Sequence, residues 1–419
     1  MGRSRSARAV LTLTAYQPGN LRAERDRASS HAMQQSQLLS QSHGPTGPAW
    51  DEGIAVTEFP SLHGDCEADV CVVGLGGSGL SCIHELLRLG QRVVGLDAAT
   101  VGGCAAGRNG GFLLGGAVTF YHDTAGIFGR DRARALYQAT LDQIDRMENE
   151  TSGTVRRTGS LRIAASVAEE LDCELQLNAM LADGFQVSSY TGPEGVGLLF
   201  PEDAAFNPVD RCRSLARTVA EAGASLFEHS HATSISGSEV RTESGLVRCR
   251  HAIVAVDGNL ERVLPELVGR VRTARLQMLA TAPAPEANFT RPVYRRWGYD
   301  YWQQLPDRRI VLGGCRDRFE NAEWTTDTSP TREVQDCMDK ILRTTLGVTQ
   351  PVQRRWAASV GYSDGVLPVF EQVRPDVWAM GGYSGTGNVV GAIYGRMAAQ
   401  IVATGSSDLA RTFAPALTA

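Results

Sequence analysis

Hydrophobic and polar positions are patterned most clearly between Asp69 and Asp97. Two short apolar runs there, Val70–Val73 and Val93–Leu96, have the length and β-branched content of buried strands. Between them, apolar residues recur at the three- and four-residue spacing of a helix. Parallel strands need a crossover connection, which is usually a helix. The order strand, helix, strand therefore predicts a βαβ unit over 69–97.

The rest of the chain mixes helical and strand-like patterns. Helical spacing predicts helices over 131–150, 167–182, 210–223, 330–346 and 389–403. Short apolar or alternating runs predict strands over 155–165, 224–227, 251–256 and 377–381, and hairpins over 233–249 and 293–314. The segment 184–207 has neither periodicity, and we expect it to be irregular. This mixture indicates an α/β (α+β) fold.

Composition narrows the class of protein. The chain has 419 residues, of which 42% are apolar and 21% charged, and this suits two domains, each with its own core. The net charge is −5 and there is no basic block, so we expect no nucleic-acid partner. No apolar run is long enough to span a membrane. The nine cysteines include no C-x-x-C pair, which favours neither a zinc site nor a disulfide scaffold and fits a reducing, cytoplasmic location.

The segment 1–65 differs in composition from the rest of the chain. Gln34 to Trp50 is rich in Gln, Ser, Gly and Pro, so we expect a disordered N-terminal tail. The segment 1–30 is rich in arginine but also contains Glu24 and Asp26, whereas a transit peptide would be poor in acids. Met1 and Met33 both remain open as the true start.

A glycine motif follows the first strand of the βαβ unit. Gly74, Gly76 and Gly79 have the G-x-G-x-x-G spacing, with Gly77 and Ser78 inside it. In such a motif the glycines permit a tight turn and close approach of the backbone to a pyrophosphate, which sits at the helix N-terminus. Asp97 ends the second strand, where the acid of such a unit accepts hydrogen bonds from ribose hydroxyls. The unit therefore predicts a dinucleotide site.

Two further glycine-rich segments follow later in the chain. One continues from the acid and contains Ala106, Gly107, Arg108, Asn109, Gly110 and Gly111. The other, Gly381–Asn388, lies between a predicted strand and a predicted helix, an arrangement that favours anions. The Gly74–Gly79 and Gly381–Asn388 segments are far apart in the sequence, and each leads into a predicted helix. Together they indicate a large cofactor.

These motifs resemble a known family. The Gly74–Gly79 motif, the acid and the Gly107–Gly111 segment are similar to those of the FAD-dependent oxidoreductases of the D-amino-acid oxidase superfamily, which includes glycine oxidase, sarcosine oxidase and γ-glutamylputrescine oxidase. The Gly-Arg-Asn-Gly-Gly sequence most resembles the last of these branches. The chain departs from the pattern at Asp97, where the family usually has Glu, and at Ala106, where it often has Ser.

The resemblance covers roughly residues 67–405 and implies two domains. A Rossmann-like FAD-binding domain is expected from 66–154, 208–274 and 352–405, and a mainly antiparallel-sheet substrate domain from 155–207 and 275–351. Tails are expected at 1–65 and 406–419. Sarcosine oxidases attach FAD through a cysteine near the segment that corresponds to 352–368, and this chain has no cysteine after Cys337. We therefore expect non-covalent FAD.

The resemblance also implies which residues contact the cofactor. It adds Thr233, Gly258 and Gly361 to those of the three glycine-rich segments. The expected FAD-binding residues are Gly74, Gly76, Gly77, Ser78, Gly79, Asp97, Ala106, Gly107, Arg108, Asn109, Gly110, Gly111, Thr233, Gly258, Gly361, Gly382, Tyr383, Ser384, Gly385, Thr386, Gly387 and Asn388.

The substrate pocket is expected around the 293–314 hairpin. Tyr299, Tyr301 and Arg296 are the candidate pocket residues, although ordinary sheet packing explains the aromatic residues equally well. Relatives commonly have Arg where this chain has Gln303. If that arginine binds a substrate carboxylate, its loss disfavours a simple α-amino acid as the substrate, and Arg296 and Arg316 are candidates to replace it. No metal site is expected.

The resemblance implies oxidation of a C–N bond of an amine or amino acid. Hydride passes to flavin N5, the imine hydrolyses, and oxygen is the expected electron acceptor. Three alternatives stay open: a flavin dehydrogenase that reduces a quinone or a carrier protein, a flavoprotein that binds or modifies a pathway intermediate, and an NAD-binding dehydrogenase.

Overall fold

A six-stranded sheet forms around the predicted βαβ unit in the computed structural model, which describes residues 47–414. The strand order is β10-β3-β2-β14-β21-β20, and all neighbours are parallel except β20 and β21. The bounds are β2 Val70–Val73, β3 Val93–Leu96, β10 Ser225–Phe227, β14 His251–Val254, β20 Val369–Arg374 and β21 Val377–Gly381.

Both faces of this sheet are buried, which explains its continuous apolar runs. Val70 and Val72 pack on one face with helices α2 (Gly77–Arg88), α7 (Pro208–Glu221) and α11 (Val390–Thr404). Cys71 and Val73 point the other way, toward a four-stranded sheet of order β1-β13-β12-β11. The bounds of that sheet are β1 Gly64–Glu67, β11 Ser234–Ile235, β12 Glu239–Arg241 and β13 Gly245–Arg248.

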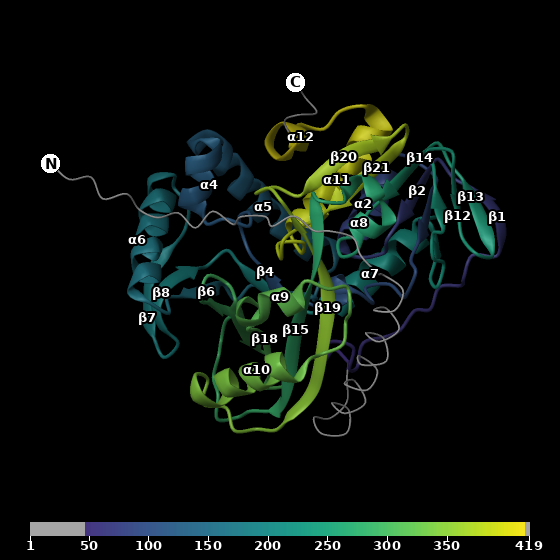
Figure 1. The fold of residues 1–419 in the computed structure, drawn as a ribbon. Helices are drawn as coiled ribbons and strands as arrows, with labels where there is room; N and C mark the ends of the chain where they lie inside the picture. The colour runs from purple at the N-terminus through teal and green to yellow at the C-terminus, as the bar shows by residue number, and fades with distance from the viewer. Residues whose placement is uncertain (1–46, 415–419) are drawn as a thin grey trace.

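An eight-stranded sheet forms the second layer of the molecule (Figure 1). Its order is β19-β15-β18-β17-β16-β6-β8-β7, and only β16 and β6 are parallel. The bounds are β6 Ser160–Ile163, β7 Ser188–Gly192, β8 Gly195–Phe200, β15 Val271–Pro283, β16 Val293–Arg295, β17 Asp300–Gln304, β18 Arg309–Gly314 and β19 Val352–Ser363. The mixed α/β class and the 293–314 hairpin are confirmed.

The remaining elements cover or connect these sheets. A three-stranded sheet contains β4 (Phe112–Leu113), β9 (Ala204–Phe206) and β5 (Val155–Arg156). The other helices are α3 Ala105–Arg108, α4 Tyr121–Phe128, α5 Arg130–Glu150, α6 Val167–Ala182, α8 Leu260–Val263, α9 Glu320–Glu323, α10 Arg332–Thr344 and α12 Asp408–Phe413, with 3₁₀ turns at Pro265–Leu267 and Arg316–Phe319. No helix among residues 47–414 has the length and apolar character needed to cross a membrane.

The long strands β15 and β19 pair along almost their whole length, from beside α10 toward the six-stranded sheet (Figure 1). Both belong to the eight-stranded sheet, although 271–274 and 352–363 fall in the ranges that we assigned to the FAD-binding domain. The division into two domains with those boundaries stays a proposal.

Three expectations about irregular segments need correction. The segment 184–207 contains β7, β8 and β9, and its edge strand β7 is largely exposed, so it lacks the apolar alternation that would reveal it. Residues 47–65 belong to the folded structure, because Trp50 is buried and β1 pairs with β13. Near the other end α12 packs on α11 through Phe413 and Tyr394. The parts of the predicted tails at 1–46 and 415–419 lie outside the described residues.

One pair of cysteines forms a disulfide bond, Cys315–Cys337, which joins the end of β18 to α10. Cysteine spacing gave no sign of this bond, because 22 residues separate the pair in sequence and only the fold brings them together. The other cysteines among the described residues are free.

Helices α2 and α11 cross closely because Gly395 has no side chain. A Cβ atom at Gly395 would lie 2.2 Å from the Ser78 carbonyl oxygen, whereas a Cβ at Gly126 in α4 would meet nothing within 4 Å. We expect Gly395→Ala to lower the free energy of unfolding by about 1–3 kcal/mol through overpacking. Gly126→Ala is the matched control and should leave stability unchanged or raise it by about 1 kcal/mol. Chemical denaturation measures both, and equal stabilities of the two variants would contradict this packing.

Candidate functional site

A large cavity lies where β2, β3 and β14 end. Its volume is about 1750 Å³, well above the roughly 300–1,000 Å³ of ordinary small-molecule pockets. Parallel strands place their carboxyl ends at one edge of the sheet, and ligands of open α/β sheets bind there. The cavity therefore has room for a cofactor and a second molecule.

The first glycine motif forms a tight turn at one end of this cavity. Gly74 has a φ of +108°, and a Cβ at Gly79 would lie only 1.8 Å from the Gly74 carbonyl oxygen. Helix α2 begins directly after the turn and has no acid in its first turn. Its free N–H groups and its dipole therefore favour an anion such as a diphosphate.

Asp97 holds this turn through both carboxylate oxygens. Oδ2 accepts the Leu75 N–H and Oδ1 accepts the Ala99 N–H, each at 2.8 Å. Burial raises the pKa of Asp97, and the two backbone bonds oppose that rise. Its side chain lines the cavity, so its remaining lone pairs can accept bonds from a ligand hydroxyl.

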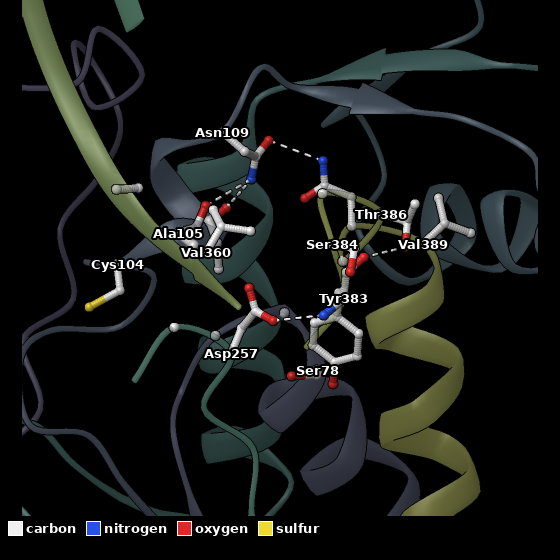
Figure 2. A pocket seen from close by; sticks show the side chains of 18 of the residues that line it. Ser78, Cys104, Ala105, Asn109, Asp257, Val360, Tyr383, Ser384, Thr386 and Val389 are labelled. Atoms are coloured by element: carbon white, nitrogen blue, oxygen red, sulfur yellow. Dashed lines mark hydrogen bonds between the residues drawn. The ribbon is translucent and has the colours of Figure 1, made fainter. Parts of the chain in front are cut away.

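Asn109 joins the second glycine segment to the third. Its Nδ2 donates to the carbonyls of Ala105 and Ala106 at 3.1 and 2.8 Å, which closes the end of α3. Its Oδ1 accepts the Gly111 N–H at 2.9 Å and Nδ2 of Asn388 at 3.1 Å. Figure 2 shows Asn109 facing the loop that carries Ser384 and Thr386. The two segments therefore form one continuous wall.

Arg108, which we expected to contact FAD, is hydrogen-bonded to backbone groups of neighbouring segments. Its Nε donates to the Gly103 carbonyl at 2.8 Å and its Nη1 to the Ala357 carbonyl at 3.1 Å. Its own carbonyl accepts the Trp356 indole N–H at 2.8 Å. Arg108 lines the cavity. Its Nε and Nη1 are bonded to backbone carbonyls, so these two atoms hold the loop against β19 and are not directed at a ligand.

The third segment contains backbone conformations that favour glycine. Gly382 and Gly385 have φ values of +71° and +92°, and Ser384 also lies in the left-handed region. Within the described chain, the backbone N–H groups of Gly385, Gly387 and Asn388 have no acceptor. They lie just before α11 begins at Val390. This end of the cavity therefore presents a second set of donors to a ligand.

The predicted cofactor residues divide into two groups. Most of them, including Thr233 and Gly258, line the cavity. Five glycines do not line it and instead let backbone segments behind it approach closely. A Cβ at these glycines would lie within 3.3 Å of a neighbouring atom: Gly79, Gly107, Gly111, Gly361 and Gly382.

The predicted substrate residues also divide into those that line the cavity and one that does not. Tyr299 and Tyr301 line the cavity, and burial raises the pKa of Tyr301. Arg296 does not line it, because its guanidinium pairs with Asp300 at 3.0 Å and with Asp317. Gln303 donates to the Gly110 and Gly111 carbonyls at 2.6 and 3.1 Å and therefore supports the second glycine segment.

Arg316 faces the cavity with part of its guanidinium unpaired. It is 9% exposed and lies against the rings of Trp324 and Tyr362, with its Cζ 4.3 and 4.5 Å from their centroids. Its Nε and Nη2 have no hydrogen-bond partner in the described chain. These two atoms form one edge of the guanidinium, the edge that binds a carboxylate in a bidentate manner. The aromatic contacts fix the plane of that edge.

Three residues of the site were not among those predicted from the sequence. Trp50 comes from the segment that we expected to be disordered, and its indole N–H donates to the Asn109 carbonyl at 2.9 Å. Asp257 accepts backbone N–H groups beside the third glycine segment (Figure 2). Asp203 lines the cavity, where burial raises its pKa to about 7, and it accepts the Ser160 hydroxyl at 2.6 Å. No predicted motif contains Trp50 or Asp203, whereas Asp257 directly precedes Gly258, which the resemblance named as a cofactor residue.

Comparison with known proteins identifies the relatives of this chain. Residues 69–401 match the sequence model of a family described as FAD dependent oxidoreductase. The chain is 24% identical to a probable oxidoreductase OrdL of Haemophilus influenzae, over 82% of this chain and 85% of that protein. It is 26% identical to the gamma-glutamylputrescine oxidoreductase of Escherichia coli, over 82% and 85%. The fold is similar to that of glycine oxidase from Geobacillus kaustophilus, with a TM-score of 0.66 at 18% identity, over 81% of this chain and 95% of that structure.

Loss of the bond between the two glycine segments should weaken cofactor binding. Asn388 Nδ2 also donates to the Phe112 carbonyl at 2.9 Å, so Asn388→Ala removes two bonds, each worth about 1 kcal/mol. We expect the FAD dissociation constant to rise about tenfold. Release of flavin fluorescence on dilution of the holoenzyme measures this change. Asn178→Ala, on the exposed face of α6, is the control, and an equal effect of both variants would contradict the role of Asn388.

Proposed function

Because this chain belongs to the family of FAD-dependent oxidoreductases, its cofactor is FAD, and we propose that it oxidises a C–N bond of a substrate that carries both an amine and a carboxylate. The names of its relatives support this substrate class, since they include a gamma-glutamylputrescine oxidoreductase and a glycine oxidase. The unpartnered edge of the buried Arg316 guanidinium is the observation within the described chain that carries the proposal.

The residues of the cavity fit FAD. One end offers the free N–H groups of α2 and a tight turn in which Gly74 and Gly79 leave no room for side chains, which suits a diphosphate. The other end offers the N–H groups of Gly385, Gly387 and Asn388. Donors in that position stabilise negative charge on a reduced ring system, because they are held in place before the charge develops. Bound FAD would supply the hydride acceptor of the reaction at its N5 atom.

The chain contributes binding and orientation to the reaction. In the proposal, Arg316 binds the substrate carboxylate through Nε and Nη2, and the aromatic side chains of Tyr301 and Tyr362 exclude water from the reacting carbon. The substrate amine binds in its neutral form and the α-hydrogen leaves as a hydride, so no protein base has to remove a proton from nitrogen or from carbon. The imine product then hydrolyses in water.

Oxygen is the electron acceptor in the proposal. The alternative acceptor is a quinone or a carrier protein, and hydrogen peroxide production in air distinguishes the two. A flavoprotein that mainly binds a pathway intermediate would show neither peroxide production nor general turnover of amines.

The proposed reaction predicts loss of flavin colour under anaerobic conditions. Mixing the holoenzyme with a panel of amino acids and amines should bleach the flavin absorbance with at least one amino acid. If no member of a broad panel reduces the flavin while dithionite does, the proposed C–N oxidation is wrong.

The unpaired edge of the Arg316 guanidinium predicts that substrates with a carboxylate are preferred. We expect Arg316→Met to lower kcat/KM for an amino acid about 100-fold or more, because a desolvated bidentate pair is lost. The decarboxylated amine of the same compound should lose much less. Arg318→Met is the control, since Arg318 is exposed and contacts the Cys337 sulfur. Equal losses for the amino acid and the amine would contradict a carboxylate contact.

A further inference from the structure

Asp257 lies at the junction of three chain segments beside the cofactor cavity. It follows β14, lines the cavity and is half-buried. Its Oδ1 accepts the Tyr383 N–H at 2.9 Å and its Oδ2 accepts the Gly361 N–H at 3.0 Å. The Gly382 N–H is also hydrogen-bonded to this carboxylate. Figure 2 shows Asp257 directed at the backbone of Tyr383.

The three donors come from two different sheets. Gly361 lies in β19 of the eight-stranded sheet, whereas Gly382 and Tyr383 follow β21 of the six-stranded sheet. Asp257 itself follows β14, which pairs with β21. The carboxylate is therefore bonded to both sheets at the point where they meet the cavity.

The local backbone is built to bring these groups together. A Cβ at Gly361 would lie 2.4 Å from the Asp257 carbonyl oxygen, and a Cβ at Gly381 would lie 2.7 Å from the Val256 carbonyl oxygen. The Ser384 N–H then donates to the Gly361 carbonyl at 2.8 Å, which continues the contact along the loop. Side chains at either glycine would push Asp257 away from its donors.

We propose that Asp257 is a positioning residue that fixes the 382–388 loop so that the N–H groups of Gly385, Gly387 and Asn388 face FAD. The carboxylate accepts the first donors of the loop and holds Gly382 at its φ of +71°. The remaining N–H groups of the loop, which have no acceptor in the described chain, are then left for the cofactor. Without Asp257, the first donors would compete for the same ligand atoms or turn toward water.

A carboxylate suits this position better than a neutral side chain. An ionised Asp only accepts hydrogen bonds, and all its partners here are donors. Burial raises the pKa of Asp257 to about 6, against the effect of the three backbone bonds, so the group is mainly ionised at neutral pH. An amide at the same place would direct an NH₂ group at one of the backbone N–H groups.

The test compares three variants of the full-length holoenzyme. Asp257→Ala removes all three bonds, and Asp257→Asn keeps the size but only one acceptor oxygen. Glu261→Gln is the matched control, because Glu261 is a neighbouring acid whose oxygens accept bonds from Thr273, at 3.1 and 3.0 Å, and it does not line the cavity. Each variant is assayed for FAD release on dilution, for the band shape of the bound flavin, and for amide exchange of a peptide that covers 377–389.

We expect Asp257→Ala to raise the FAD dissociation constant about 10- to 100-fold, since bonds to a charged acceptor are strong. Asp257→Asn should lie between this variant and the wild type. Amide exchange over 377–389 should accelerate in both variants, and the flavin band shape should change. Glu261→Gln should match the wild type in all three measurements.

Two results would overturn the proposal. One is wild-type FAD retention and band shape in both Asp257 variants. The other is unchanged exchange over 377–389 in Asp257→Asn, the variant that keeps the size of the side chain should Asp257→Ala fail to fold. The proposal rests on FAD as the cofactor but not on the substrate, so failure of every amine to reduce the flavin leaves its test intact.

Discussion

A hydrogen bond between two asparagine side chains, Asn109 and Asn388, joins the two halves of the cofactor wall across 279 residues of chain. Each half is a glycine-rich loop that leads from or into a helix, and neither encloses the cavity alone. Asn109 also donates to the Ala106 carbonyl in α3, and Asn388 also donates to the Phe112 carbonyl in β4. The shape of the cavity therefore depends on a few polar side chains that bond to backbone groups on both sides.

Charged side chains have two opposite roles around the cavity. Asp97 and Asp257 have their oxygens bonded to backbone N–H groups, so their charge is compensated by the fold. Arg316 has aromatic contacts but two nitrogen atoms without acceptors among the described residues. An unpaired buried charge is unfavourable, and it is retained where a ligand supplies the partner. This contrast separates the residues that build the site from the one that we assign to the substrate.

Local patterns in the sequence predicted the βαβ unit, the glycine turns and the main hairpins, because each is encoded within one short stretch of chain. The family and the fold class were predicted correctly from the same motifs. The strands at 188–206 were missed, because β7 is an exposed edge strand without alternation. Trp50 and Asp257 were missed because their partners are distant in sequence, Asn109 for Trp50 and Gly361 and Tyr383 for Asp257. Arg108 lines the cavity, but its hydrogen bonds to two backbone carbonyls could not be predicted, because only the fold brings those groups near it.

A crystal structure of the protein with FAD tests most directly whether both glycine walls bind one cofactor. The diphosphate should lie against the N–H groups at the start of α2, with Asp97 beside the ribose. The ring system should lie against Gly385, Gly387 and Asn388, with Tyr301 and Arg316 on the open side of the cavity. FAD that contacts the α2 turn but leaves the Gly385–Asn388 segment without any contact would contradict the site described.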